Sequence, residues 1–400
     1  MDLVIVESGA KAKTIQKYLG KNILVKASNG HVQDLPTKGK DGSKALWSHK
    51  ERNLPEPPWS WTERSENHIN RIISDGRKKK VDRVLIATDP DREGEFIAWR
   101  LSELLSEFGD IQRITFNEIT ETAIKDALKA AGTVDMNLVD AAKVRRFMDR
   151  LIGYRASRFS RSWSLSSMGR VQTPTLGFVV NREKEIENFV STPYWAVQAF
   201  VSGIDFRVRF HEKDDPKVWK DEKGKIDIHR TNDSNLADKA YEYLNLESQI
   251  TPETVSLNNY KRRPKPPFTT DTLLQASGSK YSWRPSNTMR IAQGLYEAGH
   301  ITYMRTDSTR TSNSSRQKAK EFITSKWGSN FVGKGAFGGK PKSGVQDAHE
   351  AIRPTNPLSD LPKGLDDSQK RLYRLIWARF IASQMCDSEW TSMKIQAKIE

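Results

Sequence analysis

The chain has 400 residues and carries 65 Lys and Arg against 50 Asp and Glu, a formal net charge of +15 at pH 7. This length allows roughly two to three domains, and a chain this basic is expected to bind a polyanion, either nucleic acid or an anionic membrane surface. The single cysteine, Cys386, excludes a disulfide framework within the chain and a zinc site built from several cysteines, and no apolar run approaches the length of a membrane span. The composition therefore predicts a cytoplasmic protein directed at nucleic acid.

The first third of the sequence is predicted to be α/β. Short apolar runs at Leu3–Val6, Val84–Ala87 and Ile114–Phe116 alternate with helical patterns at Ala10–Leu19 and Glu93–Phe108. This alternation predicts a mostly parallel sheet, whose functional groups lie where strands are followed by helices.

The pattern changes twice beyond residue 120. Residues 120–184 are predicted to be helical and rich in arginine, and β-like runs follow at Trp195–Val201 and Phe206–Phe210. The segment Lys261–Pro267 is predicted to be a stiff basic linker. Helical patterns return after it, at Thr270–Ser279, Asn287–Ala298, Ser314–Trp327 and Ser368–Gln384.

Three further segments have a distinct composition. Gly333–Gly344 is predicted to be a loop rich in glycine and lysine, and its glycine spacing does not match a P-loop, which disfavours a nucleotide-driven motor. The proline-containing segment Trp47–Asn67 has no role that its residues define. Thr391–Glu400 is predicted to be a strand that stops without a turn or cap, and we therefore expect the chain to be a fragment.

An acidic motif directly follows the predicted strand at 84–87. Its alternating spacing can turn Asp89, Asp91 and Glu93 toward one point at the start of the next helix. Convergent carboxylates at a strand end suit Mg²⁺, which prefers hard oxygen ligands and shares phosphate oxygens. The alternative is a solvated acidic turn whose charges are stabilised by the N-terminus of that helix.

Glu7 adds weight to the functional interpretation. It ends the first predicted strand, so in a parallel sheet it can lie beside the acidic motif. Repulsion among carboxylates raises the pKa of one of them, which supplies a proton donor near neutral pH.

An extended segment, Ile301–Thr309, places a tyrosine and an arginine on one face. The phenol of Tyr303 can attack phosphorus, and the guanidinium of Arg305 can hold phosphate oxygens. Most tyrosines only pack, however, and by composition alone Tyr296 or Tyr281 would serve equally well.

A histidine and an arginine form another candidate pair near the end of the glycine-rich region. His349 and Arg353 share one face if this segment is helical. They could bind beside a phosphate, or His349 could be an ordinary capping or core histidine.

Basic side chains are concentrated in two neighbouring stretches. The amphipathic segment Lys143–Tyr154 is followed by a glycine-containing loop at Ser167–Pro174, which suits contacts with a nucleic-acid backbone. A charge run of this kind is usually a solvated helix face. Its candidate binding residues are Arg145, Arg146, Asp149, Arg150, Arg170 and Gln172.

Together, these segments resemble the type IA DNA topoisomerases, specifically the bacterial topoisomerase I branch. The matching stretches occur in the family's order and span nearly the whole chain: Val4–Ile15, Asp89–Glu95, Arg146–Tyr154, Gly169–Gln172, Ile301–Thr309 and Ala348–Thr355.

The resemblance implies a multidomain fold that combines α/β, α and β parts in a toroid truncated at its C-terminus. The implied domains are a Toprim domain with a Rossmann-like parallel sheet at 1–134 and a helical DNA-binding domain at 135–192. A β-rich gate domain follows at 193–256 and a CAP-like domain that carries the tyrosine at 257–386. Residues 387–400 would be the truncated return strand of the gate.

The same resemblance implies an ATP-independent topoisomerase that relaxes negatively supercoiled DNA. Tyr303 would cleave one strand through a 5′-phosphotyrosine link, and another strand would pass before religation. Arg305 and Lys11 would stabilise the phosphate charge, Glu7 would donate a proton to the leaving oxygen, and His349 would orient the phosphate.

The resemblance also implies a metal site and a DNA-binding groove. Mg²⁺ would be held by Glu7, Asp89, Asp91 and Glu93. The basic residues named above would line a single-strand groove, with His31 near the active site. The expected partner is single-stranded or negatively supercoiled DNA at the nucleoid, with no membrane, and the chain is expected to be a monomer.

Two other classes stay open. One is a Toprim-type, Mg²⁺-dependent nuclease or primase that needs no covalent tyrosine. The other is an inactive fragment that only binds single-stranded DNA.

Overall fold

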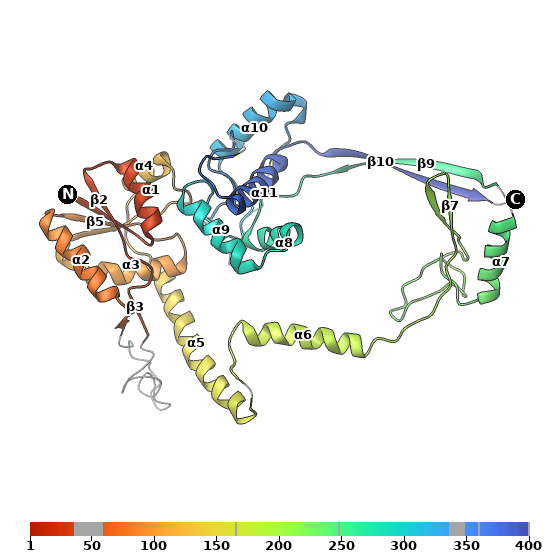
Figure 1. Cartoon of the computed structure of the whole chain (residues 1–400), viewed down its shortest axis with the longest axis horizontal. Helices are drawn as coiled ribbons and strands as arrows, with labels where there is room; N and C mark the ends of the chain where they lie inside the picture. Colours follow the sequence, from red (N-terminus) through yellow and green to blue (C-terminus); the bar gives the residue numbers. More distant parts are fainter. Residues whose placement is uncertain (36–58, 165, 247–248, 336–348, 359–360, 399–400) are drawn as a thin grey trace. The chain divides into compact units, whose positions relative to one another are not determined.

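The computed structural model describes residues 1–35, 59–164, 166–246, 249–335, 349–358 and 361–398 (Figure 1). The chain divides into two compact units: the first comprises Met1–Met168 and Arg263–Ser388, and the second comprises Gly169–Arg262 and Glu389–Glu400. Residues 47–58 of the proline-containing segment and residues 336–344 of the predicted glycine-rich loop lie outside the described residues.

A four-stranded parallel sheet begins the first unit. Its strands are β1 (Asp2–Val6), β2 (Ile23–Ala27), β5 (Arg83–Ile86) and β6 (Asp110–Arg113), in the order β2-β1-β5-β6. The parallel sheet is confirmed, and its two central strands are β1 and β5. Because these strands are fully covered, their side chains form nearly continuous apolar runs.

The third predicted strand was placed wrongly. The strand is β6, which ends at Arg113, whereas the apolar run Ile114–Phe116 continues beyond it without strand structure. Strand β6 lies at the edge of the sheet and needs fewer apolar side chains. Ile114 and Phe116 are instead buried in the core beside the sheet.

Helices cover both faces of this sheet. The face that carries Val4 and Leu85 packs against α1 (Gly9–Leu19) and α4 (Glu121–Lys129). The opposite face packs against α2 (Ser65–Lys78) and α3 (Arg92–Leu104). A separate short antiparallel pair is formed by β3 (Gln33–Asp34) and β4 (Ser60–Trp61).

Helix α5 (Met136–Ser162) packs along α3, and the chain enters the second unit soon after it. Trp59, Phe96, Trp99 and Phe147 form an aromatic cluster where α5 meets the α/β part. No helix among the described residues is long and apolar enough to cross a membrane, α5 included.

The remaining helices of the first unit lie in its C-terminal segment. They are α8 (Thr270–Tyr281), α9 (Pro285–Glu297), α10 (Asn313–Trp327) and α11 (Asp367–Ser383), close to the four predicted helices. One hydrophobic core joins them to the sheet, because Val4 and Leu85 belong to the same buried cluster as Leu295 and Ile376.

The chain after α9 approaches the α/β part very closely. Gly299 has a φ of +79°, and a Cβ atom at this position would lie 2.5 Å from the carbonyl oxygen of Ile119. A glycine is therefore required by both its backbone conformation and this contact.

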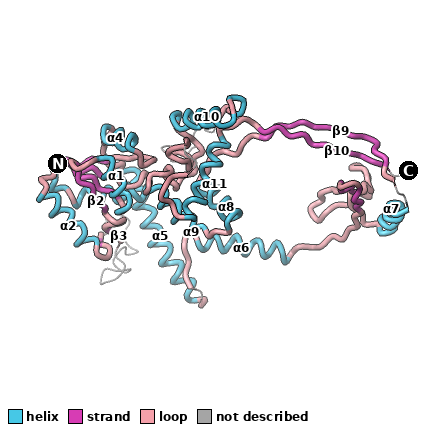
Figure 2. The backbone as a smooth tube through the Cα atoms, turned by 45° about the horizontal axis from the view of Figure 1, so that its top comes forward, coloured by secondary structure: helices cyan, strands magenta, loops and turns pink. Residues whose placement is uncertain are grey.

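The second unit combines helices with two small antiparallel sheets. It contains α6 (Gln172–Glu187), the hairpin of β7 (Gln198–Val201) and β8 (Ile204–Arg207), and α7 (Ser234–Leu246). Figure 2 shows its long ribbon of β9 (Thr251–Arg262) beside β10 (Ser388–Lys398).

The ribbon corrects one prediction and confirms another. The first two residues of the predicted linker, Lys261 and Arg262, belong to β9, because Lys261 pairs with Glu389 at 2.7 Å and Arg262 stacks on Trp390. The predicted C-terminal strand is β10 over its described residues.

Gly94 gives a first testable prediction. A Cβ atom there would lie 2.1 Å from the carbonyl oxygen of Asp89. Gly94→Ala therefore has to displace the loop that follows β5, residues 87–91, here called the acidic loop. We expect the free energy of unfolding to fall by roughly 2–4 kcal/mol in urea denaturation. Gly9→Ala is the control, because no atom lies within 4 Å of that Cβ, and it should change stability by less than about 1 kcal/mol. Equal losses in the two variants would contradict this account.

Candidate active site

The acidic side chains meet at the carboxyl ends of β1 and β5. Because these strands are parallel neighbours, Glu7 after β1 lies beside the loop that follows β5. The backbone N–H of Asp89 donates to Glu7 Oε1 at 2.8 Å. Asp91 is the N-cap of α3 and accepts from the N–H of Gly94 at 2.8 Å. Strand order and helix capping together fix the position of these carboxylates.

Arg113 holds the acidic loop in place, and sequence reasoning missed it. Its buried guanidinium donates to the carbonyl oxygens of Thr88 and Asp89, both at 2.9 Å. It also pairs with Glu95 at 2.9 Å. Nothing in the sequence around Arg113 indicates this role, because its acceptors are backbone oxygens that follow another strand, β5.

Tyr303 reaches this acidic edge from the chain after α9. Its hydroxyl donates to Asp91 Oδ2 at 2.5 Å, and Arg305 Nη1 lies 3.6 Å from the same oxygen. The tyrosine and the arginine therefore face one carboxylate, as the extended spacing predicted. Tyr281 donates instead to the carbonyl oxygen of Arg371, and the buried hydroxyl of Tyr296 has no hydrogen-bond partner among the described residues.

His349 lies against the tyrosine. The two rings stack with their centroids 5.8 Å apart, and neither ring nitrogen of His349 has a hydrogen-bond partner in the described part of the chain. Burial lowers the pKa of this imidazole below its usual value. A neutral ring with two uncommitted nitrogens beside Tyr303 can accept from or donate to a bound group.

The helical interpretation of this segment is wrong. The described residues from His349 to Arg353 are not helical, and Ile352 pairs with Phe268 while Pro354 pairs with Ile301. Arg353 consequently does not share a helix face with His349. Its guanidinium is buried between Glu118 and Glu350.

Lys11 is the buried cation of the site. Its side chain is 1% exposed and forms an ion pair with Asp89. Its ammonium also lies 5.3 Å from the ring centroid of Tyr296, which in turn packs edge-on against Tyr303. The first turn of α1 therefore places a buried positive charge in contact with Asp89 of the acidic loop.

The crowding of negative charge changes the pKa of the acids and of the phenol. Burial, followed by the charge of Asp89, raises the pKa of Glu7 to about 7. Burial also raises the pKa of Asp89, against the opposing effect of Lys11. For Tyr303, burial and then the charges of Asp89 and Asp91 raise the pKa of the phenol above its usual value. Glu7 is thus a carboxyl group that can carry a proton near neutral pH.

The four carboxylates line a cleft of about 540 Å³. The acidic loop and Arg305 form one side, and α9 contributes Ser286, Met289, Arg290 and Gln293. His31 also lines the cleft, and burial followed by the charge of Arg146 lowers the pKa of its imidazole.

The predicted DNA-binding residues divide between the two units. Arg146 is 14% exposed and is held at 2.6 Å by Glu93 and at 2.7 Å by Asp34, so it joins α5 to the cleft. Arg145 and Asp149 are exposed on α5, whereas Arg150 is half-buried with Nη2 3.4 Å from the carbonyl oxygen of Leu35. Arg170 and Gln172 are exposed in the second unit.

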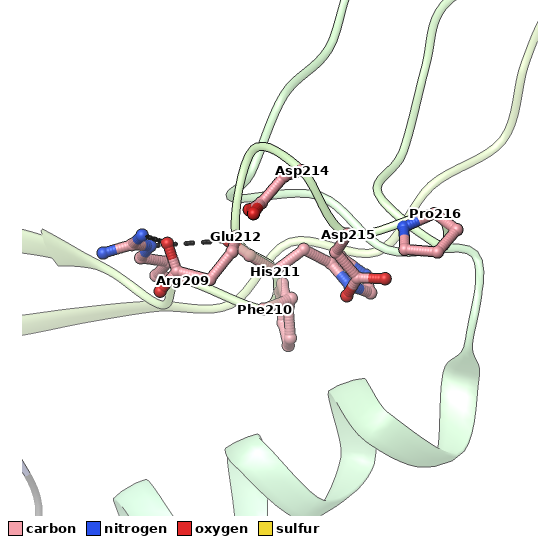
Figure 3. A pocket seen from close by; sticks show the side chains of 7 residues that line it. All are labelled: Arg209, Phe210, His211, Glu212, Asp214, Asp215 and Pro216. Atoms are coloured by element: carbon pink, nitrogen blue, oxygen red, sulfur yellow. Dashed lines mark hydrogen bonds and ion pairs between the residues drawn. The ribbon is translucent and has the colours of Figure 1, made fainter.

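A second pocket, in the second unit, has a structural explanation (Figure 3). It is lined by residues 209–212 and 214–216, and His211 is buried in it. The His211 ring contacts Asp215 at 2.8 Å and Thr231 at 3.3 Å, so both nitrogens are used to hold the turn together.

The carboxylates have the oxygen chemistry that Mg²⁺ requires, and all four line the same cleft. Each is engaged by the protein, however: Glu7 with the backbone N–H of Asp89, Asp89 with Lys11, Asp91 with Tyr303 and Arg305, and Glu93 with Arg146. Among the described residues, no three acidic, histidine or cysteine side chains are grouped so that they could hold a metal ion. The donor set therefore fits magnesium in kind, but its carboxylates are held in other pairs and are not grouped as a metal site among the described residues.

Comparison with known proteins identifies the family of both parts of the chain. Residues 2–119 match the model of the Toprim domain, a domain that generally binds metal, and residues 133–400 match the family model described as DNA topoisomerase. The solved structure of full-length topoisomerase I from Thermotoga maritima is 34% identical, with a TM-score of 0.79. The match covers 100% of this chain and 63% of that chain. The chain belongs to the type IA DNA topoisomerases, in the bacterial topoisomerase I branch.

The raised pKa of Glu7 gives a second prediction. A carboxyl group whose pKa is raised from 4.5 to about 7 contributes stability that is complete below pH 4.5 and is lost as the pH rises through 7. Glu7→Gln should therefore unfold at the same urea concentration as wild type at pH 4.5, and should be more stable by about 3 kcal/mol at pH 8. Both measurements are made in EDTA.

Glu63→Gln is the matched control, because Glu63 is exposed in a turn. It should show no such step between pH 4.5 and 8. A Glu7→Gln difference that is the same at both pH values would rule out a protonated Glu7 in the folded protein.

Proposed function

We propose that this chain carries the cleavage and religation centre of an ATP-independent type IA DNA topoisomerase. The observation that supports this most directly is the position of Tyr303, whose hydroxyl donates to Asp91 beside Arg305, at a carboxylate that lines the same cleft as Glu7. A metal-dependent nuclease would have no need of a tyrosine at this point.

In the cleavage step, the phenolic oxygen of Tyr303 attacks the phosphorus of one DNA strand. Asp91 accepts the hydrogen bond of the hydroxyl and is the group placed to take its proton. Arg305 and Lys11 balance the charge on the phosphate oxygens, and His349 orients the phosphate. The 3′ oxygen leaves with a proton from Glu7, which gives a 5′-phosphotyrosine and a free 3′-hydroxyl.

Religation is the reverse of these steps. The 3′-hydroxyl attacks the phosphotyrosine and returns its proton to Glu7, and the phenol recovers its proton from Asp91. The phosphotyrosine link conserves the energy of the phosphodiester, so no nucleotide is required.

Magnesium has a place in this scheme. Glu7, Asp89, Asp91 and Glu93 would hold Mg²⁺ once their ion pairs are exchanged for it. The ion would supply positive charge for religation and for the full relaxation cycle.

The single-stranded DNA would run along α5 and His31. Arg145, Arg146, Asp149 and Arg150 would bind it in the first unit, and Arg170 and Gln172 would do so in the second. We assign residues 1–134 to the Toprim domain, 135–192 to the helical domain, 193–256 and 387–400 to the gate, and 257–386 to the domain that carries the tyrosine. The substrate would be single-stranded or negatively supercoiled DNA at the cytoplasmic nucleoid, and the chain would act as a monomer to relax supercoils by strand passage.

The covalent link is tested with a 3′-labelled single-stranded oligonucleotide. Wild-type protein quenched with denaturant should retain the label, and Tyr303→Phe should not, because the phenylalanine ring packs equally well but has no nucleophilic oxygen. The readout is label that migrates with the protein on a denaturing gel.

The control for this experiment is Tyr296→Phe. This change removes a neighbouring hydroxyl that has no hydrogen-bond partner among the described residues, so the adduct should persist. If Tyr303→Phe retained the label and Tyr296→Phe lost it, the nucleophile would be Tyr296 and the proposal would be wrong.

The metal assignment is tested by titration calorimetry with MgCl₂. Asp89→Asn should weaken Mg²⁺ binding by about tenfold or more, because it removes a charged oxygen ligand. Asp126→Asn, on the exposed side of α4, should bind Mg²⁺ like wild type. Equal affinities for wild type and Asp89→Asn would remove Asp89 from the site.

A further inference from the structure

The reacting groups come from two separate stretches of the first unit. Residues 1–134, here called the acidic half, carry Glu7, Lys11 and the acidic loop, and residues 263–388, here called the tyrosine half, carry Tyr303. In the proposed function the 5′-phosphotyrosine stays with the tyrosine half, and this half has to move away from the acidic half before a strand can pass. The contacts between the halves therefore set how easily the site opens.

Arg353 makes a charged contact between the halves. This arginine is 3% exposed and lies between two carboxylates. Glu350, in its own half, pairs with Nε at 2.6 Å, and Glu118, in the acidic half, lies 2.9 Å from Nη1. Separation of the halves breaks only the second of these pairs.

The other contacts of Arg353 all stay within the tyrosine half. Nη2 donates to Ser312 Oγ at 3.2 Å, and Nη1 donates to the carbonyl oxygen of Pro354 at 3.2 Å. A buried arginine that lost its sole counter-charge would be strongly unfavourable. Arg353 avoids this cost because Glu350 neutralises it in both states.

Arg353 is also joined directly to the segment of the tyrosine. Its carbonyl oxygen accepts from the N–H of Thr302 at 2.9 Å, and its own N–H donates to Thr302 Oγ1 at 3.0 Å. On the opposite side, Glu118 follows Asn117, whose carbonyl oxygen accepts from the N–H of Tyr303 at 2.8 Å. The pair therefore acts on the residues that immediately flank the nucleophile.

The contact with Glu118 is suited to repeated release. Although Glu118 Oε2 lies 2.9 Å from the guanidinium, it makes no hydrogen bond of good geometry, so the attraction is mainly one of charge. The Glu118 side chain is 24% exposed and can be rehydrated when it leaves. The pair adds stability to the closed site without a directional bond that has to be rebuilt.

We propose that Arg353 is a positioning residue that holds the tyrosine half closed on the acidic half through Glu118, and that it releases Glu118 but keeps Glu350 when the site opens. This inference rests on the proposed function, because the opening of the site is needed only if a DNA strand passes through it. The closed geometry that it explains is present in the protein without DNA.

The test measures the distance between the halves in the 400-residue chain. One spin label is attached to the natural Cys386, which is exposed in the tyrosine half, and the other to Ser74→Cys, on the exposed side of α2. Pulsed electron–electron double resonance then gives the distance distribution with no DNA present. Glu118→Gln should increase the population of longer distances by about tenfold, because it removes the charge but preserves the shape.

Glu350→Gln is the matched control. It removes a carboxylate from the same arginine, but one that lies in the same half, so the closed distance should remain dominant. If the two variants give the same distribution, or if Glu118→Gln leaves it unchanged, Arg353 has no role in closure. Glu118→Asp, which keeps the charge on a shorter side chain, should give an intermediate population, and thermal melting verifies that each variant is folded.

A second readout uses the covalent adduct. Glu118→Gln should raise the fraction of trapped adduct at equilibrium several-fold, because the open site reseals less often, and Glu350→Gln should not. The two proposals fail separately: absence of any adduct from wild type contradicts the proposed function, whereas a normal adduct with unaltered distances in Glu118→Gln contradicts the role of Arg353.

Discussion

Four carboxylates share one edge of the sheet, and the electrostatic cost of placing them together governs the rest of the site. Cations from different elements offset this repulsion: Lys11 from α1, Arg146 from α5 and Arg305 from the tyrosine segment. Glu7 has a raised pKa because it is buried beside the charge of Asp89, and the charge of Lys11 offsets these effects only in part. Each cation can therefore be assigned to the carboxylate whose charge it neutralises. Glu7 lowers its own charge by holding a proton instead.

This arrangement also explains why the tyrosine and the acids belong to one unit although they are far apart in sequence. Tyr303 donates one hydrogen bond to Asp91 through its side chain and another to Asn117 through its backbone. The apolar core beneath them is continuous from the sheet to α11. The interface thus combines a non-directional apolar contact with a few directional polar ones, and only the polar contacts define which atoms face each other.

The sequence was sufficient for the features that depend on local spacing. The parallel sheet, the acidic motif after β5 and the shared face of Tyr303 and Arg305 follow from strand periodicity and strand order. It was insufficient wherever a partner is distant in the chain. Nothing local shows that Arg113 binds the backbone of the acidic loop, or that Arg146 pairs with Glu93. The segment at His349 was ambiguous for the same reason, since its extended form depends on pairing with Phe268 and Ile301.

Gly299 has a consequence for how this site can vary. Its missing side chain lets the backbone before Tyr303 come against the carbonyl oxygen of Ile119, where even one methyl group would lie 2.5 Å away. A substitution at this position would act as a wedge, because it would push the nucleophile away from its carboxylates while leaving every catalytic side chain intact. The alignment of the reacting groups therefore also depends on Gly299, which has no side chain to take part in the reaction. The catalytic motifs alone would not distinguish an aligned site from a misaligned one.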